Sequence, residues 1–337
     1  MKAMILTRTA DIEERPLELA DIPKPVPKDN EVLLKVLACG VCHTEVDEIE
    51  GRLKPPKLPV VPGHEVVGEI VEKGPDVNTL EIGQRVGVTW LNSACGQCDF
   101  CLSGRENLCD KAKWTGLDVD GGYAQFTVVP EKFAYPIPQR FSDVTAAPLL
   151  CAGVIGYRAL RLAEVANGEV VGLYGFGASA HIVIQVLRHS YPESPVFVFT
   201  RSTAHRDLAQ ELGADWTGSA TDRPPAKVNK AIDFTPVGET ILHALAASDK
   251  GARIVVNAIR KTTPIPQLDY GKYLWHEREI KSVANVTAED ARRFLPLAAE
   301  IPIIPRVQEF ELAQANEVLI SLKQGRIQAA AVLRIPH

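Results

Sequence analysis

The sequence predicts an α/β protein of two domains, and three observations lead to this prediction. The chain has 337 residues, which is longer than most single domains. Its first 150 residues contain short β-like segments separated by Gly and Pro, with little helical periodicity. From about Ala146 onward, strand-like and helix-like segments alternate. That alternation is typical of βαβ units, so we expect a β-rich domain followed by a doubly wound parallel sheet.

The individual elements follow from residue type and periodicity. In the first part, the strand-like segments are rich in Val and Ile and end at turn residues. In the tail, two helix-like segments and a strand could simply extend the α/β domain. The predicted strands are 31–38, 66–72, 85–89, 169–174, 196–200, 230–235, 253–258 and 330–335, and the predicted helices are 179–188, 204–212 (ending at Gly213), 288–299 and 312–323.

Composition excludes several classes of protein. The formal net charge of −5 argues against a sequence-independent nucleic-acid binder, which needs an excess of Lys and Arg. The sequence contains no uninterrupted apolar run of roughly 20 residues, the length that spans a bilayer. The first residues lack the apolar stretch and cleavage site of a signal peptide. We therefore expect a cytoplasmic protein that binds neither nucleic acid nor membrane.

Four of the seven cysteines fall within fifteen residues, and their spacing predicts a metal site. Four thiolates can surround one zinc ion tetrahedrally at about 2.3 Å and leave no position open for water or substrate, so such a site is structural. Gly96 and Gly104 give the loop the necessary backbone freedom. A free or disulfide-linked cluster and an iron–sulfur cluster are the alternatives. The four residues are Cys95, Cys98, Cys101 and Cys109.

Three further residues form a candidate catalytic metal site. Cys42 and His64 each lie in a short Gly-containing motif, and Cys151 follows a Pro-Leu-Leu segment. Taken alone, each is more simply a buried thiol or a histidine satisfied in a turn. Taken together, two Cys and one His leave the fourth position of zinc open for water or substrate.

A glycine-rich loop between a predicted strand and a predicted helix indicates a dinucleotide site. Gly175, Gly177 and Ala180 form a G-x-G-x-x-A motif. The first Gly permits a tight turn, the second lets the backbone approach a pyrophosphate, and the third small residue allows close helix–strand packing. The helix N-terminus then favours the phosphates. The second part of the chain is therefore predicted to be a Rossmann domain.

The end of the next predicted strand indicates which cofactor is preferred. NAD usually requires an acidic residue there, whereas this chain has Thr200, Arg201 and Ser202. Thr200 and Ser202 can donate hydrogen bonds, and Arg201 can pair with a 2′-phosphate. We expect NADP, with NAD as the alternative; Arg201 could instead be a solvated loop charge.

These motifs together resemble the zinc-containing medium-chain dehydrogenases, in particular bacterial alcohol and cinnamyl-alcohol-type dehydrogenases. The resemblance covers nearly the whole chain, because the motifs occur in the family's order and at its approximate spacing. They are GVCHT (40–44), GHEVVGEI (63–70), CGQCDFCLSGRENLC (95–109), DGGYAQF (120–126), CAG (151–153) and GLYGFGASA (172–180).

The resemblance implies roles for individual residues. Cys42, His64 and Cys151 match the catalytic zinc ligands, and the clustered cysteines match the structural ones, which implies two Zn²⁺ per chain. Glu65 matches a carboxylate that approaches the metal when ligands exchange. Thr44 matches the hydroxyl that relays the alcohol proton, and His43 a residue near the cofactor pyrophosphate.

Three positions depart from the family pattern. Glu45 replaces the usual Asp and should orient His64. Asp47 replaces a common His and could accept the relayed proton, or the relay could end at solvent. Leu53 replaces a Trp that narrows the substrate pocket, which favours a bulkier substrate. Trp90 lines that pocket by resemblance, or is ordinary core.

The resemblance also implies the domain arrangement and the reaction. A GroES-like catalytic domain would span 1–150, a Rossmann domain 151–287, and the tail 288–337 would return to the first domain. The expected reaction transfers hydride between a primary alcohol, with room for a bulky or aromatic one, and NAD(P). Small-molecule alcohols and aldehydes would be the partners, and the chain would form a homodimer or homotetramer. A zinc-ribbon interaction module and a quinone-reductase-like enzyme without catalytic zinc are the alternatives.

Overall fold

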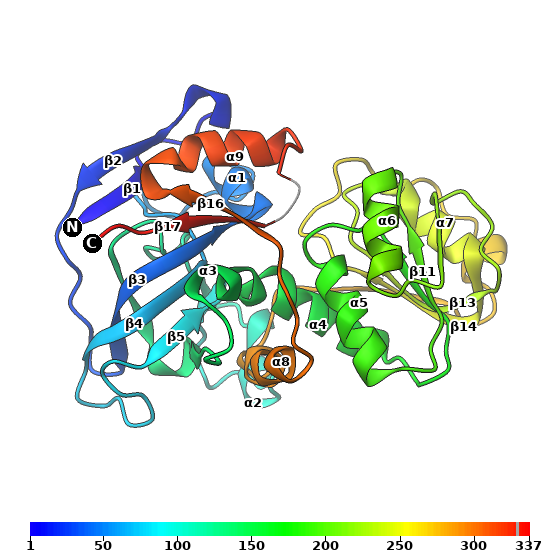
Figure 1. The fold of residues 1–337 in the computed structure, drawn as a ribbon, viewed down its shortest axis with the longest axis horizontal. Helices are drawn as coiled ribbons and strands as arrows, with labels where there is room; N and C mark the ends of the chain where they lie inside the picture. The colour runs from blue at the N-terminus through cyan, green and yellow to red at the C-terminus, as the bar shows by residue number, and fades with distance from the viewer. Residues whose placement is uncertain (328–329) are drawn as a thin grey trace. The chain divides into compact units, whose positions relative to one another are not determined.

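The computed structural model describes residues 1–327 and 330–337 (Figure 1). Its contacts divide the chain into two compact units. Unit 1 comprises Met1–Cys151, Asn285–Ala299 and Ile304–His337, and unit 2 comprises Ala152–Ala284 and Glu300–Ile303. The chain therefore leaves unit 1 directly after Cys151 and returns to it near its end.

The main sheet of unit 1 is built on a long strand, β3, most of whose residues are buried. β3 pairs antiparallel with β4, β8 and β17, and β17 pairs parallel with β16, so the end of the chain is hydrogen-bonded into the sheet formed by its beginning. Along the sheet the order is β16 (Val307–Glu311), β17 (Ala330–Arg334), β3 (Glu31–Val41), β4 (Glu65–Lys73), β5 (Arg85–Val88) and β9 (Ala134–Pro136), with β8 (Phe126–Pro130) paired to β3.

Smaller elements surround this sheet. The two short antiparallel pairs are β1 (Lys2–Leu6) with β2 (Leu17–Asp21), and β6 (Leu91–Ser93) with β7 (Lys113–Trp114). The helices are α1 (His43–Ile49), α2 (Asp99–Leu102), α3 (Asp143–Ala146), α8 (Ala288–Glu300) and α9 (Ala315–Lys323), and the 3-10 turns are η1 (Ile12–Glu14), η2 (Glu106–Leu108), η3 (Glu131–Phe133), η4 (Ala147–Leu150) and η6 (Leu312–Gln314).

Unit 2 contains the parallel sheet that the alternating pattern predicts. Every ladder in it is parallel, and the strand order reverses direction at β10, as in a doubly wound sheet. The order is β12 (Trp216–Gly218), β11 (Val196–Phe199), β10 (Val171–Tyr174), β13 (Val228–Asp233), β14 (Ser248–Val256) and β15 (Glu279–Ser282), and the helices are α4 (Ala152–Ala163), α5 (Ala180–Ser190), α6 (Thr203–Glu211), α7 (Glu239–Ala247) and the π-helical turn η5 (Tyr270–Leu274).

Aromatic packing forms part of the core of unit 2. The rings of Tyr174 and Phe199 stack with centroids 4.1 Å apart, and Trp216 packs edge-on against Phe199 at 5.1 Å. Such contacts contribute beyond simple burial. They join β10, β11 and β12 behind the loop that carries the glycine motif.

The predicted strands and helices are present, but in the described residues five helices and several short strands were not predicted, and one predicted strand begins earlier than expected. α1, α2 and α3 escape prediction because they are short, with seven, four and four residues. α4 and α7 are rich in apolar residues, and such segments are hard to tell from buried strands by sequence pattern alone. β14 begins at Ser248 instead of residue 253, since its first four residues are polar or Gly and do not resemble a strand.

One helical stretch among the described residues, Asp143–Ala163, is long and apolar enough to cross a membrane by length and composition. In the structure, 67% of the most apolar part of this stretch is buried within the protein. Burial of this extent is what a core helix of a folded protein shows. The segment also contains Cys151, one of the candidate metal ligands.

Candidate metal centres and cofactor loop

The predicted catalytic ligands lie together within unit 1. One donor atom from each of Cys42, His64, Glu65 and Cys151 lies within 4.8 Å of every other. The sulfurs of Cys42 and Cys151 are 3.9 Å apart, which is far longer than a disulfide bond of about 2.05 Å. Two thiolates on one tetrahedral zinc, each about 2.3 Å from the metal, would be about 3.8 Å apart. The geometry therefore fits a shared metal ion.

The strand pairing explains why residues far apart in sequence meet here. Cys42 directly follows β3 and is the N-cap of α1, while His64 directly precedes β4. β3 and β4 pair so that Gly40 lies opposite Glu65, which places the two motifs side by side. Cys151 arrives from η4, whose Leu side chains are buried in the same unit.

A second motif fixes the turn that presents His64. Gly63 has a φ of +98°, a conformation that favours glycine. The amide of Gly121 donates to the Val61 carbonyl at 2.7 Å, and the amide of Gly122 donates to the Gly63 carbonyl at 2.8 Å. A Cβ on Gly121 would lie 2.1 Å from the Gly63 oxygen. The DGGYAQF segment therefore needs its glycines to hold the His64 turn.

Glu45 connects the helix to the metal ligand. One carboxylate oxygen accepts a hydrogen bond from the Cys42 amide at 2.8 Å, and the other pairs with Nδ1 of His64. Both side chains are fully buried. Burial lowers the pKa of His64, but the charge of the Glu45 carboxylate opposes this effect, and the pKa of His64 lies well above its usual value. Pairing at Nδ1 leaves Nε2 of His64 as the nitrogen available to a metal.

Nε2 of His64 is a buried polar atom without a hydrogen-bond partner among the described residues. Such an atom is costly unless something binds it. Together with the two nearby thiols, whose contact lowers the pKa of Cys42 and raises that of Cys151, it forms a Cys₂His donor set suited to zinc. Burial raises the pKa of Glu65, the fourth residue of the group.

The predicted relay residues lie on α1. The Thr44 hydroxyl is 3.5 Å from the Cys42 sulfur, so it lies beside the candidate metal site. Asp47 is buried and pairs with Arg52, which also pairs with Glu50. The sequence did not indicate Arg52 as a partner, because the pairing depends on the turn that follows the helix. His43 is exposed at the start of α1.

Trp90 lies next to the metal ligands. Its ring centroid is 6.1 Å from that of His64, and it stacks on Trp114 at 4.9 Å. Leu53 is partly buried, and its amide donates to the Asp47 carbonyl at 2.9 Å. Glu48, which sequence reasoning did not single out, accepts a hydrogen bond from the Trp90 indole.

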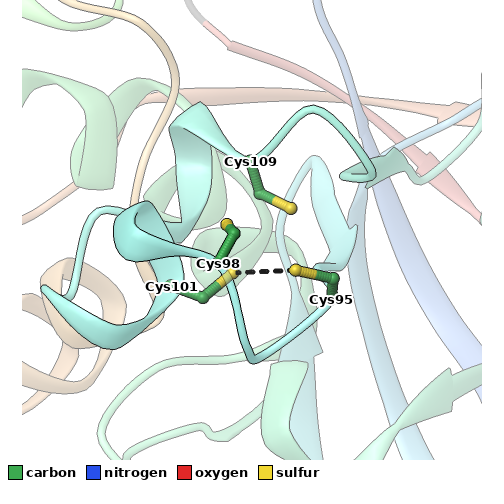
Figure 2. A group of neighbouring side chains, drawn as sticks. All are labelled: Cys95, Cys98, Cys101 and Cys109. Carbon is green, nitrogen blue, oxygen red and sulfur yellow. Dashed lines mark hydrogen bonds between the residues drawn. The ribbon is translucent and has the colours of Figure 1, made fainter.

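The four clustered cysteines converge as their spacing predicts (Figure 2). Their sulfurs all lie within 4.8 Å of one another, and those of Cys95 and Cys101 are 3.8 Å apart, close to the separation on one zinc ion. None of the seven cysteines is in a disulfide. A cluster of two or four irons would distribute the four thiolates over different iron atoms and spread the sulfurs further. The arrangement therefore fits a single tetrahedral ion best.

The glycine loop has the expected strand–turn–helix setting. Gly175 has a φ of +84° directly after β10, and its amide donates to the Phe199 carbonyl at 2.8 Å. A Cβ on Gly177 would meet no atom within 4 Å, so this backbone is open to approach by a ligand. Ala180 is fully buried at the start of α5, where a small residue is required.

The residues predicted to choose the cofactor lie directly after β11. Thr200 is buried, whereas Arg201 and Ser202 are exposed. The Ser202 hydroxyl accepts a hydrogen bond from the His205 amide at 3.3 Å and so caps α6. Arg206, which the sequence reading missed, donates to the Thr200 carbonyl at 2.9 Å. Its position in the first turn of the helix that follows the strand is the feature of the sequence that could have indicated Arg206.

The fold and the sites define a two-unit oxidoreductase of the medium-chain dehydrogenase type, and comparisons with known proteins agree. Residues 28–139 match the alcohol dehydrogenase GroES-like domain. A probable alcohol dehydrogenase, AdhA, of Mycobacterium tuberculosis is 44% identical, covering 99% of this chain and 97% of that relative. An alcohol dehydrogenase of Geobacillus stearothermophilus is 34% identical, covering 96% of each. The structure of a cinnamyl alcohol dehydrogenase from Sorghum bicolor matches with a TM-score of 0.87 at 26% identity, covering 99% of this chain and 97% of that one.

This chain belongs to the medium-chain, zinc-containing alcohol dehydrogenase family. Its class of activity is that of an alcohol dehydrogenase, and its first unit contains the GroES-like domain. The interaction-module alternative does not account for the parallel sheet and glycine loop of unit 2.

Proposed function

We propose that this chain is a zinc-dependent alcohol dehydrogenase that transfers hydride between a primary alcohol and NADP, and reduces the matching aldehyde in the reverse direction. The observation that carries the proposal is the convergence of Cys42, His64 and Cys151 next to the Thr44 hydroxyl. When bound, zinc acts as a Lewis acid on the substrate oxygen. The clustered cysteines would hold a second, structural zinc.

The chain's own residues supply positioning and proton transfer. Glu45 holds His64 with Nε2 directed away from the Glu45 contact, so the histidine can act as a neutral ligand. Thr44 accepts the alcohol proton and passes it outward. Asp47 lies one helical turn further along α1 and is the carboxylate we assign to receive that proton, with Arg52 holding it in place.

The cofactor proposal rests on charge. The 200–202 segment after β11 offers no carboxylate to a ribose, and Arg201 is exposed there with Arg206 anchored close by at the Thr200 carbonyl. Guanidinium groups favour a 2′-phosphate, whereas NAD recognition uses an acidic side chain. The assignment of a bulky or aromatic substrate rests on Leu53 and on the similarity to the sorghum cinnamyl alcohol dehydrogenase. A homodimeric or homotetrameric assembly and a cytoplasmic location remain predictions.

One experiment tests these points together. The purified protein is analysed for zinc and assayed with acetaldehyde, isobutyraldehyde and cinnamaldehyde, each with NADPH and with NADH. We expect two zinc ions per chain, turnover of cinnamaldehyde, and a higher kcat/KM with NADPH. The C151S variant should lose one zinc and nearly all activity, while C39S, a buried thiol outside the ligand set, should retain both.

The outcomes separate the parts of the proposal. A fully zinc-loaded chain that reduces none of the aldehydes overturns the alcohol dehydrogenase assignment. A higher kcat/KM with NADH overturns only the cofactor preference.

A further inference from the structure

Glu48 is a buried carboxyl group that the catalytic mechanism does not use. It lies on α1, one turn after Glu45, and its side chain is only 1% exposed. Oε1 accepts a hydrogen bond from the Trp90 indole N–H at 3.1 Å. Oε2 is buried with no hydrogen-bond partner among the described residues. Burial, followed by the charge of Glu45, raises the pKa of Glu48 well above its usual value.

The group that Glu48 holds is the ring beside the metal ligands. The backbone of Trp90 is fixed, since its carbonyl accepts the Thr115 amide at 2.7 Å. Its ring lies near two other rings, with centroid distances of 6.1 Å to His64 and 4.9 Å to Trp114. The indole N–H is the only hydrogen-bonding group on this side chain, so its bond to Glu48 fixes how the ring is turned.

A carboxyl group is a costly way to fill this position. A buried acid with one oxygen unpartnered destabilises the fold relative to an apolar side chain of similar size. Groups that cost stability without evident structural gain are typical of functional positions. The evident benefit of Glu48 is the fixed orientation of Trp90.

We propose that Glu48 is a positioning residue that sets the orientation of the Trp90 ring next to the metal ligands and thereby determines which substrates fit. This inference rests on the proposed function. A ring held at one angle presents a wall of fixed shape to the substrate, whereas a ring that can turn presents a looser wall. Discrimination between substrates of different size is then the property that depends on Glu48.

The test compares E48Q, E48L, W90F and the E48L/W90F double variant. Gln keeps a hydrogen-bond acceptor of the same size, so E48Q should behave as the wild type. Leu removes the acceptor, so E48L should change the ratio of kcat/KM for cinnamaldehyde to that for acetaldehyde by about tenfold, mainly through KM. In the W90F background, E48L should change this ratio little further, because the hydrogen bond is already absent.

Two further measurements separate positioning from a general structural role. The thermal midpoint of E48L should equal or exceed that of the wild type, and its zinc content should be unchanged. The Trp90 indole N–H resonance, assigned by its loss in W90F, should shift and exchange faster in E48L but not in E48Q.

An unchanged Trp90 resonance in E48L, or an equal loss of kcat/KM for all substrates, overturns the positioning role. Loss of zinc from E48L overturns it as well. A wild-type protein that is inactive on every aldehyde overturns the proposed function instead, and the Trp90 resonance is read independently of that result.

Discussion

Gly40 lies directly beneath the carboxylate of Glu65 in the β3–β4 ladder. A Cβ at this position would be 2.0 Å from one carboxylate oxygen and 2.7 Å from the carboxyl carbon. The backbone of Gly40 needs no unusual torsion angle, so the requirement is for space alone. The Gly in the GVCHT motif is therefore explained by the residue opposite it, which the local sequence does not reveal.

G40A is expected to displace Glu65 from the metal group and to lower kcat/KM by at least about tenfold, an effect of about 1.4 kcal/mol or more on the transition state. Steady-state kinetics and zinc analysis check this. G271A is the matched control, because a Cβ there meets nothing closer than 3.5 Å and its torsion angles do not require Gly. Equal activity of G40A and wild type would contradict the role given to the close contact.

Glu45 stands where the family usually has Asp, and the site accommodates the longer side chain. It caps α1 through Cys42 and also pairs with His64. The resemblance to the family implies the pairing with His64. The capping contact becomes visible only in the structure, because it depends on the angle at which the chain enters the helix.

At the scale of elements, two thiols of the four-cysteine loop differ in pKa. Hydrogen bonds from the backbone amides of Gln97 and Cys98 lower the pKa of the Cys95 thiol from 9.0 to about 6. Burial raises the pKa of Cys101 to about 12. Since the folded pKa of Cys95 lies below its unfolded value, its stabilising effect is complete above about pH 9 and is lost as the pH falls through about 6.

In protein stripped of metal, Cys95 is therefore expected to react first. At pH 7 the Cys95 side chain would be mostly thiolate, whereas the Cys101 side chain would be mostly protonated. After chelation and a short iodoacetamide pulse at pH 7, peptide mass spectrometry should show modification of Cys95 well ahead of Cys101. The zinc-loaded protein is the control and should resist at both positions. Equal rates in the stripped protein would contradict this difference in pKa.

Across the whole molecule, the C-terminal helix is tied to segments about three hundred residues earlier. The Lys323 ammonium at the end of α9 contacts Asp11 at 2.8 Å, Glu13 at 2.7 Å and Glu50 at 2.7 Å. Desolvation lowers the pKa of Lys323, but these carboxylates together raise it above its usual value. Contact with Glu13 and with Lys323 lowers the pKa of Asp11. α9 also lies beside α1 (Figure 1).

K323M is expected to lower the free energy of unfolding by about 1 kcal/mol, measured by urea denaturation at neutral pH and low salt. The raised pKa of Lys323 stabilises the fold at pH values below the pKa of an unfolded Lys, and the lowered pKa of Asp11 stabilises it above the pKa of an unfolded Asp. The difference in stability between variant and wild type should therefore be largest between about pH 4 and 10. It should shrink in high salt. A difference that does not depend on pH or salt would point to lost packing of the Lys stem instead.

The amino-acid sequence by itself determined the division into a β-rich part and a parallel α/β part, because these patterns reflect local periodicity. It also determined the cysteine loop and the glycine loop, whose residues are close neighbours along the chain. Only the tertiary structure decided how Cys42, His64 and Cys151 meet, that the last strand pairs with β3, and that Glu48 reaches Trp90. Strand register, turn angle and side-chain orientation control these contacts, and each depends on residues distant in sequence.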